Sequence, residues 1–98
     1  MEFDIIWSNR ARAELRAIHD CISLDNPTAA DRVRDAIYQR VEVLRGAPRL
    51  AQVYDCDSPN EVRHTVSGKY RIFFSINETE RRVEVLCVWH GARQEPEL

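Results

Sequence analysis

The sequence has few of the features that mark secreted, membrane-bound or cofactor-dependent proteins. Its 98 residues contain three cysteines, at positions 21, 56 and 87, without Cys-x-x-Cys spacing, which predicts reduced thiols rather than a disulfide framework. No apolar run approaches the roughly 18 residues of a membrane span, and the first residues lack the basic, apolar and small-residue segments of a signal peptide. We therefore expect one cytoplasmic domain over residues 1–98, with no membrane association.

Metal and nucleotide chemistry find little support in the residue spacing. The three cysteines could join a histidine in a zinc site, but the ligand spacing of zinc proteins is missing, and His19 and Cys21 would point to different faces of a helix. The three glycines, at positions 46, 68 and 91, lie too far apart to form a phosphate-binding loop. We expect no metal and no cofactor.

Charge excludes a general affinity for polyanions. The formal net charge is −2 and the pI is about 5.9, so nucleic acid would not be attracted to the protein as a whole. Positive charge gathers toward the C-terminus, because residues 61–93 carry six Lys+Arg against four Glu, a net charge of +2. Any site for an anion is therefore expected on the C-terminal strands.

Two segments have the periodicity of amphipathic helices. After a strand-forming segment at residues 2–7, Ser8 can cap a first helix, and Asn26, followed by Pro27, can cap a second helix that ends at Gly46. Few residues separate the two helices, so they must be antiparallel neighbours. The apolar stripes are Ala11, Leu15, Ile18 and Ile22 in the first helix and Ala30, Val33, Ile37, Val41 and Leu44 in the second.

The second half of the chain is typical of an antiparallel meander. Residues 47–60 have no periodicity and contain two prolines, so we expect a loop before it. The predicted fold is α+β, with a helical hairpin on one face of a small, mainly antiparallel four-stranded sheet in the order β-α-α-β-β-β. The predicted strands of the meander are 61–66, 70–76 and 83–89, joined by turns at 67–69 and 77–82.

Alternation predicts which strand residues face the helices. We assign Val62, His64 and Val66 to the core face, and Val83, Val85, Cys87 and Trp89 to one face of the last strand. The open face would then present Arg63 and Arg71, with His90 or Arg93 from the end of the last strand. Converging cations on an open sheet face suit an anion, either a phosphate or a carboxylate of a partner.

Each of these residues also has a purely structural interpretation. Arg63 and Arg71 are typical of the solvated face of an antiparallel sheet, and His90 is typical of a half-buried strand end. A nucleophilic pair of Cys87 and His90 is disfavoured because alternation places the two side chains on opposite faces. Enzyme chemistry would therefore rest on His90 and arginines alone.

Five segments occur in an order and spacing that are typical of one group of proteins. They read “IIWSNRARAELRAI”, “NPTAADRV”, “VEVLRGAPRL”, “VRHTVSGKYRIFFSI” and “VEVLCVWHGAR”. Together they cover nearly the whole chain and resemble the RelE/ParE superfamily of bacterial type II toxins. The resemblance implies a compact toxin encoded beside an antitoxin, whose C-terminal segment wraps and neutralises the toxin.

The superfamily has two main branches, and the resemblance favours the ParE branch. Toxins similar to RelE cut messenger RNA in the ribosomal A site with cationic residues and a C-terminal Tyr or His, whereas toxins similar to ParE poison DNA gyrase. The ending “VWHGAR” resembles the ParE ending. The loop “VYDCDSPNE” lacks the lysines that ribonuclease members tend to have, and nothing aromatic follows Arg93. A net charge of −2 is also poorly suited to binding ribosomal or messenger RNA.

The resemblance therefore implies a toxin that inhibits DNA gyrase by binding and forms a hetero-oligomer with a cognate antitoxin, without specific nucleic-acid binding. Its target contacts would be Arg63, Arg71, His90 and Arg93. In a first alternative, a ribosome-dependent mRNA interferase, His90 would be the acid-base group and the arginines would stabilise phosphate charge. In a second, the chain is an inactive relic that binds only antitoxin. A partner helix or an added strand could bury the flanks of the hairpin or the sheet edges.

Overall fold

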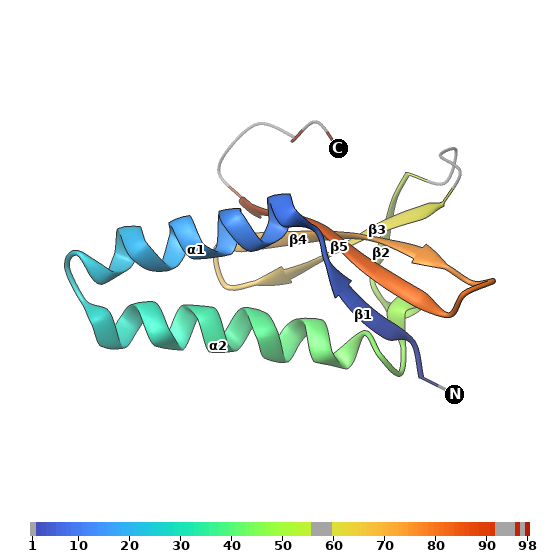
Figure 1. Ribbon diagram of the computed structural model, residues 1–98, viewed down its shortest axis with the longest axis horizontal. Coiled ribbons are helices and arrows are strands. Elements are labelled where there is room, and N and C mark those ends of the chain that lie inside the picture. The colour runs from blue at the N-terminus through green and yellow to red at the C-terminus, as the bar shows by residue number, and fades with distance from the viewer. Residues whose placement is uncertain (1, 56–59, 92–95, 97) are drawn as a thin grey trace.

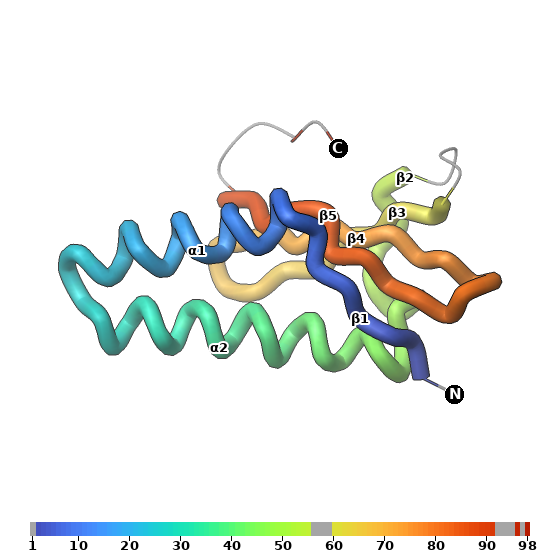
Figure 2. The backbone as a smooth tube through the Cα atoms, in the orientation of Figure 1, coloured from blue at the N-terminus to red at the C-terminus, as the bar shows by residue number. Residues whose placement is uncertain are grey.

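The computed structural model describes residues 2–55, 60–91, 96 and 98, and it confirms the predicted α+β class. Helices α1 and α2 lie side by side along one face of the sheet, and the turn that joins them extends beyond it (Figures 1 and 2). In chain order the elements are β1 (Asp4–Trp7), α1 (Asn9–Ser23), α2 (Pro27–Val43), the 3-10 helix η1 (Pro48–Leu50), β2 (Gln52–Asp55), β3 (Glu61–Ser67), β4 (Tyr70–Asn77) and β5 (Arg82–His90).

Both predicted helices form and begin at the predicted caps. Ser8 Oγ accepts a hydrogen bond from the N–H of Ala11 at 3.0 Å, and Asn26 Oδ1 accepts one from the N–H of Ala29 at 3.1 Å. Pro27 occupies the first turn of α2, where its missing N–H has no intrahelical partner to lose. The caps satisfy amides that would otherwise be orphaned, so the start of each helix is determined locally.

Within the described residues the sheet has five strands rather than the four predicted. Its order is β1-β5-β4-β3-β2, with β1 parallel to β5 and the other neighbouring pairs antiparallel. The additional strand, β2, lies inside residues 47–60, so the prediction of a loop there is wrong for Gln52–Asp55. This strand is short, and its pairing with β3 shifts register around Tyr54. Such a segment shows no alternation that periodicity could detect.

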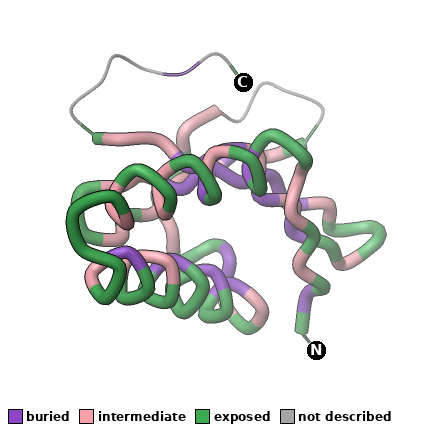
Figure 3. The backbone as a smooth tube through the Cα atoms, turned by 60° about the vertical axis from the view of Figure 1, so that its left-hand side comes forward, coloured by how far each residue is buried: buried purple, intermediate pink, exposed green. Residues whose placement is uncertain are grey.

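The core lies between the helical hairpin and the sheet. Buried segments follow the strands and recur along the helices (Figure 3). Each large apolar side chain that is fully buried contributes about 1.5–3 kcal/mol. One cluster of buried residues joins Ala11, Leu15, Ile37 and Val41 of the helices to Ile72, Val85 and Val88 of the sheet, and a second joins Phe3, Leu44, Phe74, Ile76 and Val83.

A β-bulge in β5 moves the end of this strand to the other face. The partners of Phe74 and Phe73 on β5 are two residues apart, so that Leu86 is the extra residue. The two valines before the bulge face the helices, whereas Cys87 and Trp89 beyond it face away. The prediction that the four apolar residues at positions 83, 85, 87 and 89 share one face is therefore wrong, because an inserted residue reverses the alternation.

Strand β3 presents to the helices the face opposite to the predicted one. Arg63 pairs with Phe74, which packs in the helix-side core, whereas His64 pairs with Phe73 on the far face. The assignment of His64 and its flanking valines to the helix-side core is therefore wrong. Alternation could not decide this point, because β4 is apolar and buried on both faces.

Candidate functional site

The residues predicted to form one cationic site lie in separate environments. Arg63 is on the helix side near the β2 edge, and Arg71 is on the opposite face of the sheet. His90 pairs with Tyr70 at the far end of β4, on the helix side. Arg93 lies outside the described residues. The prediction that one open face presents the described members together is therefore wrong.

Arg63 braces the edge of the sheet. Its Nη1 donates hydrogen bonds to the carbonyl oxygens of Arg49 at 2.9 Å and Ala51 at 2.6 Å, and its Nε contacts the Glu61 carboxylate. The hydrogen bond from Arg63, supported by the nearby charge of Arg49, holds the pKa of Glu61 below its usual value. The guanidinium thus ties η1 and the start of β2 to β3, which is a structural role.

Arg71 belongs to a cluster of rings on the sheet face away from the helices, and we call Tyr54, His64, Arg71 and Phe73 the aromatic cluster. The His64 ring stacks on the buried Phe73 ring, with 5.6 Å between centroids and 15° between planes. Tyr54 meets both rings edge-on, at centroid distances of 4.9 Å to Phe73 and 5.8 Å to His64. The Arg71 guanidinium lies 4.8 Å over Phe73, and its Nη2 is 3.3 Å from His64 Nδ1.

This arrangement prepares Arg71 for an anionic or aromatic partner. A guanidinium held over a ring is oriented before binding and loses little freedom when a carboxylate or phosphate docks. Trp89 of β5 pairs with Arg71 of β4 and so lies on the same face of the sheet. Neither Tyr54 nor His64 was predicted as a site residue, because Tyr54 lies in the segment predicted as a loop and His64 was assigned to the core face. The available signal was Phe73, a large apolar residue on a face otherwise predicted to be polar.

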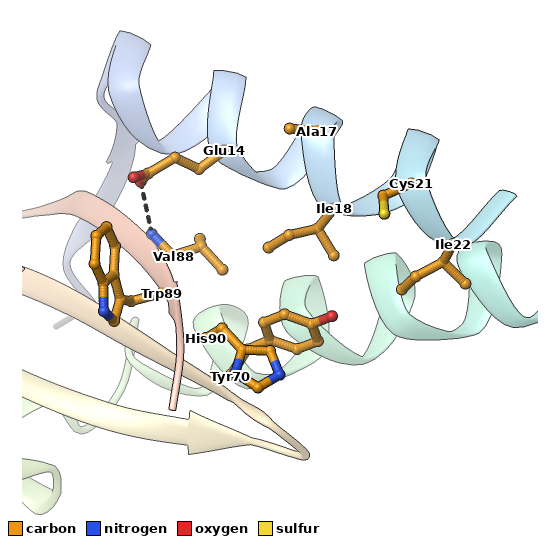
Figure 4. A pocket seen from close by; sticks show the side chains of 9 residues that line it. All are labelled: Glu14, Ala17, Ile18, Cys21, Ile22, Tyr70, Val88, Trp89 and His90. Atoms are coloured by element: carbon orange, nitrogen blue, oxygen red, sulfur yellow. Dashed lines mark hydrogen bonds between the residues drawn. The ribbon is translucent and has the colours of Figure 1, made fainter. Parts of the chain in front are cut away.

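On the helix side, α1 and the end of β5 enclose a groove, which we call the hairpin groove. The groove has two hollows. The first, between α1 and β5, has a volume of about 420 Å³, and the second, of about 430 Å³, lies beside the β3–β4 turn and shares Ile22 and Tyr70 with the first. The exposed lining is mostly apolar, as expected for a surface that packs against a partner. Figure 4 shows the residues that line the first hollow: Glu14, Ala17, Ile18, Cys21, Ile22, Tyr70, Val88, Trp89 and His90.

His90 lines this groove. Its ring meets Tyr70 edge-on, with 5.5 Å between centroids. The following Gly91 donates its N–H to the Lys69 carbonyl at 2.8 Å, and a Cβ at this glycine would lie 3.2 Å from that oxygen. The glycine therefore permits a close backbone approach at the end of β5. This approach and the bulge together place His90 beside α1 rather than beside Arg71.

The chemistry of the remaining groups is limited. Cys87 is buried, and burial, together with the nearby Glu14 carboxylate, raises the pKa of its thiol to about 11, so it is a poor nucleophile. Its side chain also lies on the face opposite to His90. Across the described residues, no group of three His, Cys, Asp or Glu side chains is placed to hold a metal ion. No helix in that part of the chain has the length and hydrophobicity to cross a membrane.

Known structures share this fold at low sequence identity. A chain of a chromosomal ParDE toxin-antitoxin system from P. aeruginosa aligns with a TM-score of 0.74 and 19% identity, over 90% of this chain and 95% of its own. An archaeal RelE-RelB complex from Pyrococcus horikoshii gives 0.71 and 13%, over 96% and 100%. The RelBE2 toxin-antitoxin complex from Mycobacterium tuberculosis gives 0.66 and 17%, over 92% and 99%. These likenesses concern the fold alone.

Sequence comparison identifies the family. No curated protein sequence matches the chain significantly. A family model described as “ParE toxin of type II toxin-antitoxin system, parDE” matches residues 5–95. Because this match spans nearly the whole sequence, the chain belongs to the ParE toxin family of type II toxin-antitoxin systems.

Proposed function

We propose that this toxin arrests growth by binding and inhibiting DNA gyrase, and that a cognate antitoxin neutralises it. The observation that carries the proposal is the match to the ParE family over residues 5–95. The P. aeruginosa structure similar to this chain is likewise described as a ParDE system. In this proposal the toxin acts by contact with its target, without turnover.

The arrangement of the cations supports binding over the form of RNA cleavage predicted from the sequence. Such cleavage would use His90 for proton transfer and Arg63 and Arg71 to stabilise phosphate charge. All three would have to reach one phosphate at hydrogen-bond distance. Among the described residues, Arg71 is separated from the other two by the sheet itself.

The target contact in this proposal is the aromatic cluster. Arg71 supplies the charge and Trp89 supplies additional ring surface on the same face. Aromatic and arginine side chains carry a disproportionate share of the energy at protein interfaces. Arg93 and His90 remain proposed contacts at the end of the last strand, whereas Arg63 contributes through its bracing of β2.

A second candidate function is favoured by one contact. The distance of 3.3 Å between Arg71 Nη2 and His64 Nδ1 pairs a titratable ring with a phosphate-binding group on the open face. A ribonuclease could use His64 for proton transfer and Arg71 for charge stabilisation. The mRNA interferase alternative would then depend on His64 rather than His90.

Pulse labelling after induction distinguishes the two functions. The chain is induced without antitoxin, and incorporation of labelled thymidine and labelled methionine is followed. Gyrase inhibition predicts that thymidine incorporation falls first. A first fall in methionine incorporation, with cut transcripts that disappear in His64→Ala, would establish the ribonuclease instead. If neither falls, the chain is a relic or has a different target, and only antitoxin binding remains of the proposed function.

Purified proteins test the proposed contact directly. The toxin should inhibit supercoiling of relaxed plasmid by gyrase, and Arg71→Ala should weaken this inhibition at least tenfold. Arg32→Ala is a matched control, because Arg32 is exposed on α2, away from the aromatic cluster. Circular dichroism confirms folding of both variants. Equal inhibition by both variants would remove Arg71 from the target contact.

We also propose that the antitoxin occupies the hairpin groove, which offers the apolar surface that a partner segment can bury. The probe is the protein encoded by the reading frame adjacent to this gene, co-expressed with the toxin. Ile22→Glu introduces a charge at the junction of the two hollows and should abolish co-purification. Val43→Glu makes the same kind of change at an exposed site at the end of α2 and should leave binding intact. Loss of binding in both variants, or in neither, would argue against the groove.

A further inference from the structure

Strand β5 is longer than its parallel neighbour β1. Its parallel pairing with β1 ends where Trp7 lies opposite Val85, but β5 continues to His90. After Trp7 the chain leaves the sheet through Ser8 and enters α1 (Figure 1). Within the described residues, the last part of β5 therefore has β4 on one side and a helix on the other.

The backbone of β5 turns hydrogen-bonding groups toward that helix. Gly91 donates its N–H to Lys69 on the β4 side. Successive N–H groups along a strand point to opposite edges, so those of His90 and Val88 point toward α1 and the hairpin groove. This edge has the form to which another strand can add.

The side chains of Ser8 and Glu14 lie where a neighbouring strand would be. The N–H of Val88 donates a hydrogen bond to Glu14 Oε1 at 3.0 Å, drawn in Figure 4. Two residues earlier, Ser8 Oγ donates one to the carbonyl oxygen of Leu86 at 3.0 Å. The Glu14 carboxylate thus accepts the hydrogen bond that a carbonyl of a neighbouring strand would accept at this edge.

Glu14 makes a second bond that a partner could also replace. Its Oε2 lies 3.2 Å from Nε of Arg10, whose guanidinium carbon is 5.9 Å from the Trp89 ring. When Glu14 is displaced, Val88 needs a new acceptor and Arg10 has lost a carboxylate. A complementary occupant therefore supplies a carbonyl oxygen and a negative charge.

A strand meets the first requirement along its whole length, whereas a helix has free carbonyls only in its last turn. The carbonyls inside a helix are bonded to its own amides, so a helix docked along its side would leave Glu14 in place on Val88. An extended segment has carbonyls to offer, and every second side chain would enter the apolar groove near Ile18 and Ile22.

We propose that the antitoxin adds a short β-strand to the Val88–His90 edge of β5, displacing the Glu14 carboxylate. This inference rests on the proposed neutralisation by an antitoxin and specifies its mode. The added segment alternates apolar residues facing the groove and carries an Asp or Glu that takes over the bond to Arg10. Glu14 is then a placeholder that satisfies the edge until the partner arrives.

Nuclear magnetic resonance can identify the acceptor of the Val88 amide. The sample is the complex of the isotope-labelled toxin with the labelled product of the adjacent reading frame. A scalar coupling across the hydrogen bond, from Val88 nitrogen to a backbone carbonyl carbon of the partner, is the expected result. A complex in which Val88 still couples to the Glu14 carboxyl carbon would overturn the proposal and indicate a helix or another occupant.

Binding measurements on a charge variant provide an independent test. Glu14→Gln weakens the charge-assisted bond that the strand must displace, so the partner should bind about fivefold more tightly. Asp20→Asn removes the same charge from an exposed position of α1 outside the groove and should leave affinity unchanged. Weaker binding by Glu14→Gln would show that Glu14 contacts the partner and would overturn the placeholder role.

Antitoxin binding and strand addition are refuted by different results. If the product of the adjacent reading frame forms no complex with the toxin, both antitoxin binding and strand addition are refuted. If a complex forms and neutralises toxicity, but the Val88 amide keeps its bond to Glu14, the proposed function stands and the strand is refuted.

Discussion

Replacement of Arg63 by alanine tests whether this residue braces the fold or touches the target. The half-buried hydrogen bond to the Ala51 carbonyl is charge-assisted, and such a bond contributes about 1.5–3 kcal/mol. The bond to the Arg49 carbonyl is exposed, and the pair with Glu61 is partly screened, so together they add about 0.5 kcal/mol. We therefore expect Arg63→Ala to lower the free energy of unfolding by about 2–3 kcal/mol. For a domain of this size, that loss corresponds to a fall in Tm of about 10–20 °C.

Urea unfolding followed by circular dichroism measures this loss. Arg63→Lys should recover less than half of it, because one ammonium cannot reproduce the fork that bridges two carbonyl oxygens and a carboxylate. Arg32→Ala should change stability by less than about 0.5 kcal/mol, as is usual for an exposed position. At a temperature where it is folded, Arg63→Ala should still arrest growth. A variant as stable as the parent but without toxicity would refute the bracing role and return Arg63 to the target contact.

Three further changes test the core, the helical hairpin and the thiols. Ile37→Ala should cost about 3 kcal/mol in urea unfolding, because this fully buried side chain lies between α2 and the sheet; a loss below 1 kcal/mol would contradict the packing. The hydrogen bond from His19 lowers the pKa of Asp31, so its contribution to stability is complete above about pH 4 and lost as the pH falls below it. Asp31→Asn should therefore reduce the difference between urea midpoints at pH 6 and pH 3, and an unchanged difference would exclude this pair. At pH 8 iodoacetamide should modify the exposed Cys21 but leave Cys87, whose pKa of about 11 leaves about one thiol in a thousand ionised; peptide mass spectrometry would reveal modified Cys87 if its burial were wrong.

The helices could be predicted because their signals are local. Ser8 and Asn26 each cap a helix through a hydrogen bond to an amide three residues away, and Pro27 suits only the first turn. Such contacts need no knowledge of the rest of the molecule. The apolar stripes then required the two helices to bury one side against a common surface.

The faces of the strands could not be predicted because they depend on partners far along the chain. Alternation gives two sets of residues, but the register with β4 decides which set lies under the helices. The bulge at Leu86 arises from the pairing of β5 with β4 and leaves no signal in a run of apolar residues. Strand β2 similarly exists because Arg63 and β3 hold it at the edge.

The candidate site was predicted only in part, because its side chains come together from different strands. Arg71 was identified as a cation on an open face, and it lies on the face away from the helices. Its ring partners, Tyr54 and His64, were missed because they come from β2, which was predicted as a loop, and from β3, whose faces were exchanged. Clusters that form across three strands are visible only after the register is known.

The bulge explains how one strand can carry two surfaces. It turns the Trp89 side chain to the sheet face of Arg71 and the His90 side chain to the helix side, and both residues also line the hairpin groove. Arg10 links the two surfaces, because it is paired with Glu14 beside the groove and lies over the Trp89 ring. A strand that displaces Glu14 and recruits Arg10 would change what lies against Trp89. A strand in the groove would also cover His90, a proposed target contact, so the antitoxin and gyrase would compete for the end of β5.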